Sequence, residues 1–218
     1  MMKTLKNFDR NLADLLSDAY KWEYTKINDN SSLSKAKKPK SFFTRFQWVL
    51  ILISVVAVVL CPRGIDTDFA GYIISGMSLF VGLLFTLVVS LFDKFSNTDF
   101  SKYKKSNNQD LYVVGVRLKN FFKKTIILTL YSAIIAIVCI LMLALTMMSP
   151  KLSTEIDIMT IVQSYNIDNL SYYIKSMLLL TYRISLCYLL LNFIYITKIL
   201  ITSFYDYIVN EIDKISLQ

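Results

Sequence analysis

The chain has 218 residues, of which 55% are hydrophobic, and it carries a formal net charge of +8. It contains no histidine and only three cysteines, with no C-x-x-C pair, so a histidine-dependent triad and a usual zinc site are excluded. The apolar residues are gathered in long uninterrupted blocks, which is typical of an integral membrane protein rather than of a soluble domain.

The first segment, residues 1–27, is predicted to be an amphipathic cytoplasmic helix. Its apolar face contains Leu5, Phe8, Leu12, Leu15, Leu16 and Ala19. Such a helix either lies on the inner membrane surface or docks on the cytoplasmic part of this chain or a neighbour. The remaining face carries both charge signs, whereas surface-binding helices are enriched in Lys and Arg, which favours docking. Residues 28–45 form a polar, basic linker that leads into interfacial aromatic residues.

Four apolar runs follow, at residues 46–61, 69–92, 125–149 and 176–201. A bilayer core requires about 20 apolar residues per helix, so each run is predicted to span, with residues 41–45 lengthening the short first one. The link at 62–68 is too short for anything except an antiparallel connection. The expected fold is all-α, with four transmembrane helices in two antiparallel hairpins plus cytoplasmic amphipathic helices.

The distribution of basic residues predicts the orientation. Residues 1–45 hold ten Lys and Arg and the loop 93–124 holds eight, against one in 62–68 and two in 150–175. The positive-inside rule therefore places both termini and the loop 93–124 in the cytoplasm, with the protein in the inner membrane. This bias largely accounts for the net charge, so nucleic-acid binding is not needed to explain it.

Small residues predict where the helices contact one another. The second span carries Gly71, Ser75, Ser78 and Gly82 at helical spacing, and the third carries Ser132, Ala136 and Cys139 at matching steps. Small side chains let helix backbones approach closely, so we expect the second span to pack on the third along these rows.

Two helices are expected to extend beyond the membrane. A helix is predicted from Leu111 directly into the third span, and its mixture of Phe with Lys and Arg favours anchoring at the membrane boundary over binding of single-stranded nucleic acid. The outer segment predicts a short helix at 154–162. The fourth helix should begin near Asn169 and continue through the C-terminal extension 202–218.

The fourth span carries the candidate functional residues. One helical face presents a polar stripe of a pore or helix interface, comprising Thr181, Ser185, Tyr188, Asn192, Tyr195 and Thr202. Lipid offers such a stripe no partners, so this face should meet protein or water. Arg183 lies off that face. Its guanidinium either reaches outward to the interface or joins a ring of arginines in an oligomer, which would favour anions.

The spans contain no Asp or Glu and the chain has no glycine-rich phosphate loop, so we expect neither an enzyme nor a cofactor or metal. In architecture the chain resembles the small four-helix membrane components of bacterial anti-phage defence systems. That resemblance implies a homo-oligomeric pore, or a protein that holds a cytoplasmic protein partner at the inner membrane. We therefore carry two hypotheses, a pore or membrane-perturbing assembly in the lipid bilayer and a non-conducting scaffold.

Overall fold

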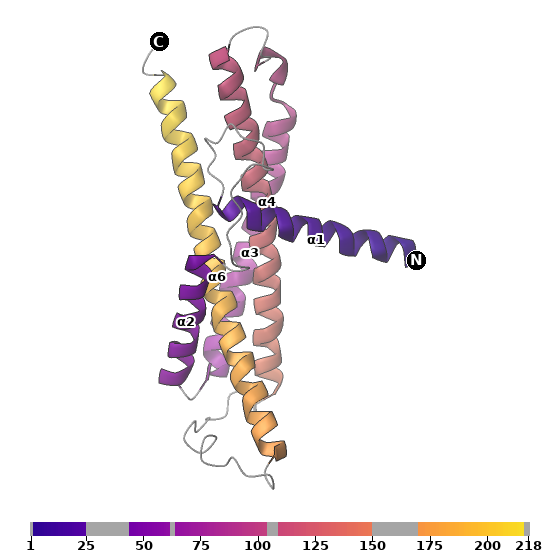
Figure 1. Ribbon diagram of the computed structural model, residues 1–218, viewed down its shortest axis with the longest axis vertical. Helices are drawn as coiled ribbons and strands as arrows, with labels where there is room; N and C mark the ends of the chain where they lie inside the picture. Colours follow the sequence, from indigo (N-terminus) through magenta and orange to yellow (C-terminus); the bar gives the residue numbers. More distant parts are fainter. Residues whose placement is uncertain (1, 25–43, 62–63, 104–108, 150–169, 216–218) are drawn as a thin grey trace. The chain divides into compact units, whose positions relative to one another are not determined.

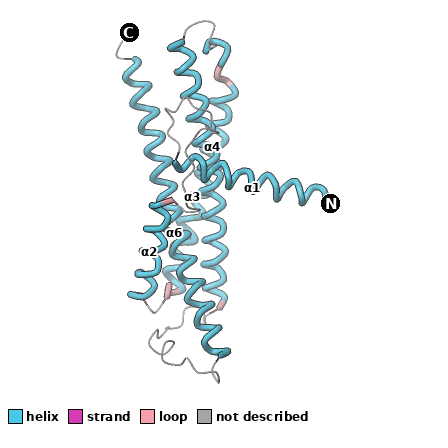
Figure 2. Tube along the Cα trace, in the orientation of Figure 1, coloured by secondary structure: helices cyan, strands magenta, loops and turns pink. Residues whose placement is uncertain are grey.

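The computed structural model describes residues 2–24, 44–61, 64–103, 109–149 and 170–215. These residues form five α-helices and one 3-10 helix, and no strand occurs among them (Figures 1 and 2). The helices are α1 (Met2–Tyr24), α2 (Arg45–Leu60), α3 (Thr67–Ser96), α4 (Gln109–Met148) and α6 (Leu170–Ile215), with η2 at Phe100–Tyr103. The predicted all-α class is confirmed.

Three of the helices are long and apolar enough to cross a membrane, over Thr67–Ser96, Leu111–Met148 and Ser171–Val209. The remaining apolar helix, α2, has 16 residues and rises about 24 Å, against about 30 Å for a bilayer core. The structure thus supports a membrane protein with three candidate spans, and a fourth span remains a prediction.

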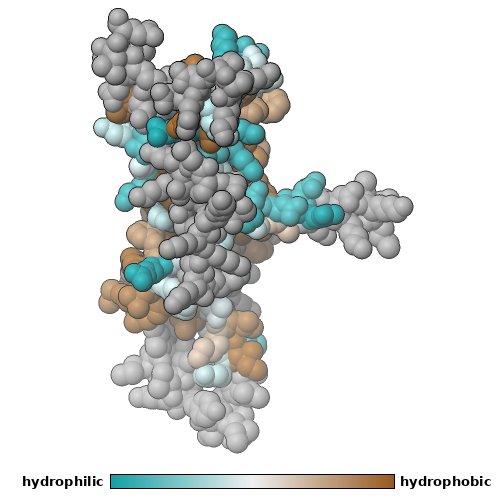
Figure 3. Space-filling view, turned by 45° about the horizontal axis from the view of Figure 1, so that its top comes forward, coloured by the Kyte–Doolittle hydropathy of each residue, from teal (hydrophilic) through white to brown (hydrophobic). Residues whose placement is uncertain are grey.

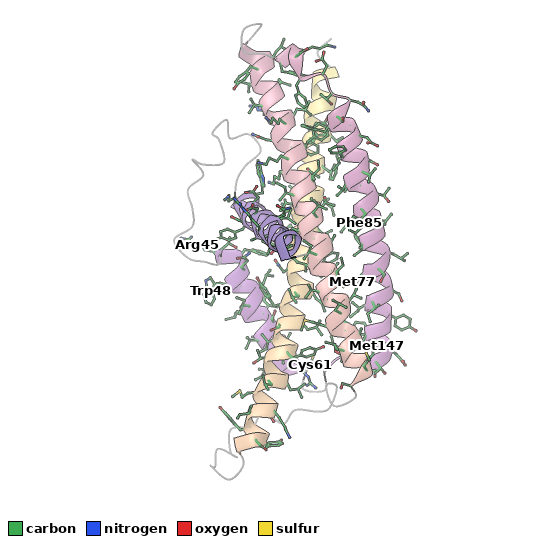
Figure 4. All side chains as sticks on the ribbon, turned by 90° about the vertical axis from the view of Figure 1, so that its right-hand side faces the viewer. Arg45, Trp48, Cys61, Met77, Phe85 and Met147 are labelled. Atoms are coloured by element: carbon green, nitrogen blue, oxygen red, sulfur yellow. The ribbon has the colours of Figure 1, made fainter. Side chains whose placement is uncertain are left out.

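A capping box fixes the beginning of α2. Thr44 has extended backbone angles, and its Oγ1 accepts a hydrogen bond from the backbone N–H of Gln47 at 3.3 Å. The Gln47 side chain accepts the Thr44 N–H in return at 3.0 Å. The cap makes Arg45 the first residue of α2, so the expected lengthening of the helix does not include Thr44. Residues 41–43 lie outside the described residues. Figure 4 shows Arg45 and Trp48 near the beginning of α2 and Cys61 after its end.

The long helices α4 and α6 agree with the predicted extensions. Helix α4 runs without a break from Gln109 through Met148, and α6 starts at Leu170 and continues to Ile215. The linker 28–43 and the short helix predicted at 154–162 lie outside the described residues.

The chain divides into two compact units. The first unit comprises Met1–Lys38, Gly82–Ile134 and Ile196–Gln218, and the second comprises Pro39–Val81 and Ile135–Tyr195. The first has a core of Leu91, Phe121 and Phe122, and the second a core of Ala70, Leu143 and Leu186. Helices α3, α4 and α6 each contribute a segment to both.

Helix α3 buries one narrow face. Its buried apolar residues recur at every seventh position and are Ala70, Met77, Leu84 and Leu91. A seven-residue repeat is the spacing by which one helix keeps a continuous seam against its neighbours. The rest of α3 is largely exposed, and it includes Phe85, which is 48% exposed.

Candidate functional site

The polar stripe predicted on the fourth span is not one continuous exposed face. At its centre Asn192 is only 2% exposed, and Tyr195 stacks on Phe46 of α2 with ring centroids 4.2 Å apart. Tyr188 and Ser185 are half-buried. The middle of the stripe is therefore packed inside the chain, within the second unit.

The two ends of the stripe are exposed but locally satisfied. The hydroxyl of Thr181 donates to the Met177 carbonyl at 2.8 Å, and that of Thr202 donates to the Lys198 carbonyl at 3.0 Å. A hydroxyl that bonds to the carbonyl four residues earlier is compatible with a lipid environment, because its polarity is masked by the helix itself. These two residues require no partner from another subunit.

Asn192 is the most demanding polar group of the stripe. Its Oδ1 atom is buried and accepts no hydrogen bond within the described part of the chain. A buried polar atom left unpaired costs free energy on the order of 1–3 kcal/mol. Asn192 is thus the polar residue of the stripe whose burial costs most within the described part of the chain.

Arg183 lies against the turn that joins α2 to α3. The side chain is 7% exposed, and a Cβ atom built on Gly64 would lie 2.9 Å from the guanidinium Cζ. Gly64 has a φ of +68°, a conformation that side chains disfavour. Glycine is therefore favoured at position 64 for two reasons, which are its positive φ and the close approach of the Arg183 side chain. The guanidinium of Arg183 therefore lies against the α2–α3 turn.

A hydrogen-bonded contact between α4 and α6 was not identified from the sequence. The hydroxyl of Tyr182 donates to the Met142 carbonyl and lies 2.9 Å from the Thr146 hydroxyl, which in turn donates to the Met142 carbonyl. The signal was present, because Thr146 continues the buried row of Ser132, Ala136 and Cys139 at the same spacing. Extending that row by two steps would have found it.

The small residues of α3 do not make the predicted contact. Ser75, Ser78 and Gly82 are exposed, and a Cβ atom on Gly82 would meet nothing within 4 Å. Only Gly71 comes near α4, where its Cβ would lie 3.9 Å from the Met147 Cε atom. The expected rows therefore do not pair, although Ser132 and Ala136 on α4 are buried. The larger residues of the seven-residue seam bury more apolar area and determine how α3 packs.

We refer to Gly71, Ser75, Ser78 and Gly82 as the α3 small face. The hydroxyl of Ser75 donates to the Gly71 carbonyl at 3.0 Å, so its hydrogen bond is made within the helix itself. Around it lie large exposed apolar side chains such as Leu79 and Leu83. Among the described residues nothing covers the α3 small face at Ser75, Ser78 and Gly82, so another helix can approach closely there.

The described residues hold no group of three or more His, Cys, Asp or Glu side chains that could bind a metal ion. Comparison with known proteins gives no family model, no curated protein and no solved structure that matches the chain.

Proposed function

We propose that the chain is a non-enzymatic multi-pass membrane protein that self-associates in the inner membrane and acts there as a pore or membrane-perturbing assembly. In this proposal α2 forms a fourth, short span, the helices form two antiparallel hairpins, and both termini are cytoplasmic. The resemblance to defence-system components makes anti-phage defence the biological setting to test.

The observation that carries self-association is the uncovered α3 small face. Helix association in lipid lacks a hydrophobic driving force and depends on close backbone approach at small residues. Within one chain α3 leaves Ser75, Ser78 and Gly82 exposed and packs through its seven-residue seam instead. In the proposed homo-oligomer, a helix of a second copy of this chain packs on these exposed small residues.

The same face is also the best candidate to line a path. The α3 small face exposes serine hydroxyls and a glycine. The polar stripe of the fourth span is a weaker candidate to line a pore, because its centre is packed within the chain. A lumen along α3 would be lined by small polar groups, which admit water more readily than leucine does.

The test is Gly82→Leu, alone and with Ser78→Leu, in purified full-length protein. Oligomer size is measured by native mass spectrometry in detergent, and ion flux is measured in liposomes. If the small face is a subunit contact, the leucine variants should shift to smaller species and lose flux. If it lines a lumen, assembly should survive and flux should fall because the path dries.

Leu178→Ala is the control, since Leu178 lies on α6 rather than on the helix that carries the small face and is 66% exposed. It should leave oligomer size and flux unchanged. Leucine variants that retain both wild-type size and wild-type flux would contradict the proposal.

A second candidate function is a scaffold that binds a cytoplasmic protein, and it is favoured by the ordered core of the first unit. There Phe121 stacks on Tyr207 at 4.2 Å, and Lys94 lies 5.6 Å from the centre of the Tyr207 ring. So well packed a core provides a rigid platform for a partner. This function would be favoured if the purified protein is monomeric, gives no ion flux in liposomes and co-purifies with a protein partner from its own cell.

A further inference from the structure

Helix α2 is held against α6 at two points within the second unit, one at its beginning and one just after its end (Figure 1). The ring of Phe46 stacks on Tyr195 at 4.2 Å, and Gly64 lies against the guanidinium of Arg183. The two points are about 18 Å apart along the axis of α6. Both lie inside Ser171–Val209, the part of α6 that is long and apolar enough to cross a membrane. Helix α2 therefore runs antiparallel beside a candidate span.

The open side of α2 is wide and apolar. Between Trp48 and Leu60 the only polar residue is Ser54, which is buried and donates its hydroxyl to the Leu50 carbonyl at 2.8 Å. With successive residues about 100° apart, the exposed large apolar side chains occupy about half of the helix circumference. They include Val49, Leu52, Ile53, Val55, Val56 and Val59. The part of α2 seen at the left of Figure 3 is hydrophobic, as this composition requires.

Lipid chains fit this surface better than another helix does. A helix that packs on protein needs an apolar stripe of about 100°, and the open side of α2 is wider than that. Helices that associate within lipid do so through small residues, whereas every exposed residue of α2 is large. In this respect α2 differs from the α3 small face, which suits a second helix.

Charged residues limit the apolar length on this side. Arg45 is exposed at the first position of α2, and Asp66 is exposed just before α3. The 16 residues of α2 rise about 24 Å between them. On the adjacent α6, Arg183 and Lys198 are separated by a similar rise of about 22 Å. Helix α2 and its neighbour therefore present an apolar belt about 6 Å shorter than a typical bilayer core.

The other long helices have a greater apolar length. Helix α4 contains no charged residue from Thr125 through Met148, and α3 contains none from Phe69 through Phe92. Each of these stretches rises about 36 Å. A long helix can tilt to fit a thin hydrocarbon layer, whereas a short helix cannot lengthen to fit a thick one. The short helix therefore determines which hydrocarbon thickness fits this side of the bundle.

We propose that α2 is a lipid-facing span that selects phospholipids with short acyl chains, so that the bilayer is thinner beside it. The inference rests on the proposed function, in which α2 is the fourth, short span, and it states how the assembly perturbs the membrane. Long acyl chains beside α2 must compress to keep Arg45 and Asp66 in water, and this compression costs free energy that short chains avoid.

The test measures lipid selectivity at two helices of the same full-length protein. Trp22→Phe and Trp48→Phe remove both tryptophans. A single reporter is then introduced by Leu52→Trp on α2 or by Leu141→Trp on α4, at positions that are 66% and 60% exposed. Each protein is reconstituted in vesicles that mix brominated dioleoyl phosphatidylcholine with dimyristoleoyl, dioleoyl or dierucoyl phosphatidylcholine. Quenching of the tryptophan by bromine gives the relative affinity of each lipid for that helix.

The surface around position 52 should bind the short dimyristoleoyl lipid about threefold more strongly than the long dierucoyl lipid. The surface around position 141 is the control and should show no such preference. Equal selectivity at the two positions would overturn the proposal and would leave α2 as a span. Absence of quenching at position 52 in every lipid would overturn the proposal together with the fourth span of the proposed function.

The wild-type chain provides a second measurement that needs no substitution. Trp48 is 54% exposed on α2, whereas Trp22 is 1% exposed, so bromine in the lipid chains reaches mainly Trp48. The preference for the short lipid should therefore appear in the wild-type fluorescence, and its absence there would also contradict the proposal. Oligomer size and ion flux are measured separately, so failure of self-association leaves this test intact.

Discussion

The cores of the two units are built from different side chains. The first unit gathers large aromatic residues, with Phe121 and Phe122 joined by Phe95, Phe204 and Tyr207 around Leu91. The second is built from Ala70, Leu143 and Leu186, with Tyr182 and Thr146 forming hydrogen bonds beside them. The first core therefore gathers aromatic rings, whereas the second joins aliphatic side chains to an interhelical hydrogen bond.

This difference corresponds to two ways of holding helices together. Aromatic residues bury a large area and stabilise strongly wherever water is displaced. Within lipid that driving force is absent, so small residues, van der Waals packing and interhelical hydrogen bonds take its place. The second unit combines aliphatic packing with an interhelical hydrogen bond, whereas the core of the first unit is dominated by aromatic rings. Substitutions in the two units should accordingly differ in size.

The largest effect is expected from Phe121→Ala in the first unit. Phe121 is 2% exposed and contacts the rings of Phe122, Phe204 and Tyr207. Removing a buried phenylalanine leaves a cavity and typically costs about 3–5 kcal/mol. Thermal unfolding in detergent should show a large loss of stability. Phe92→Ala is the control, because Phe92 is 60% exposed, and equal melting of the two variants would contradict the aromatic core.

A smaller effect is expected from Gly115→Ala. A Cβ atom at this position would lie 2.4 Å from the Cβ atom of Tyr103, so the η2 segment must move away from α4. Such overpacking costs about 1–3 kcal/mol, which outweighs the better helix propensity of alanine. Limited proteolysis after Lys102 should become faster. Gly76→Ala is the matched control, since a Cβ atom there meets nothing within 4 Å and the variant should melt no lower than the wild type.

The sequence predicted the helices well and their contacts poorly. Long apolar blocks and the start of α6 near Asn169 follow from local composition, which residue patterns record directly. The cap at Thr44 was missed because the apolar run at 46–61 is short for a bilayer core, and the helix was expected to extend backwards to make up the length. The α3 small face was assigned to the wrong partner, because spacing shows which residues share a face but not what covers that face. The Gly64–Arg183 contact joins residues far apart in the chain, and no local pattern reports it.

That contact gives the third prediction, in the second unit. Gly64→Ala should destabilise by about 1–2 kcal/mol through its positive φ alone, and further by displacing the guanidinium of Arg183. The double-mutant cycle with Arg183→Ala separates the two contributions. With Arg183 removed, Gly64→Ala should retain only the backbone cost, so the two substitutions should not add. Strict additivity of the melting changes would show that the close approach does not matter.

The smallest effect is expected from Tyr182→Phe, which tests the polar contact between α4 and α6. The substitution removes only the hydroxyl that lies 2.9 Å from Thr146 and donates to the Met142 carbonyl, and it leaves the ring in place. Thr146 keeps its own bond to that carbonyl at 3.1 Å, so no donor is left unpaired. Hydrogen bonds between transmembrane helices average about 0.6 kcal/mol, so the expected shift in melting is small.

The comparison with Phe121→Ala is informative even though the Tyr182→Phe effect is small. Thr146→Val should produce a similar small loss, and the double variant should lose less than the sum, because both changes remove the same contact. If Tyr182→Phe instead costs as much as Phe121→Ala, the hydroxyl must be shielded from every alternative partner. The second unit would then depend on its polar contacts as strongly as the first depends on its aromatic core, and the contrast between the two units would fail.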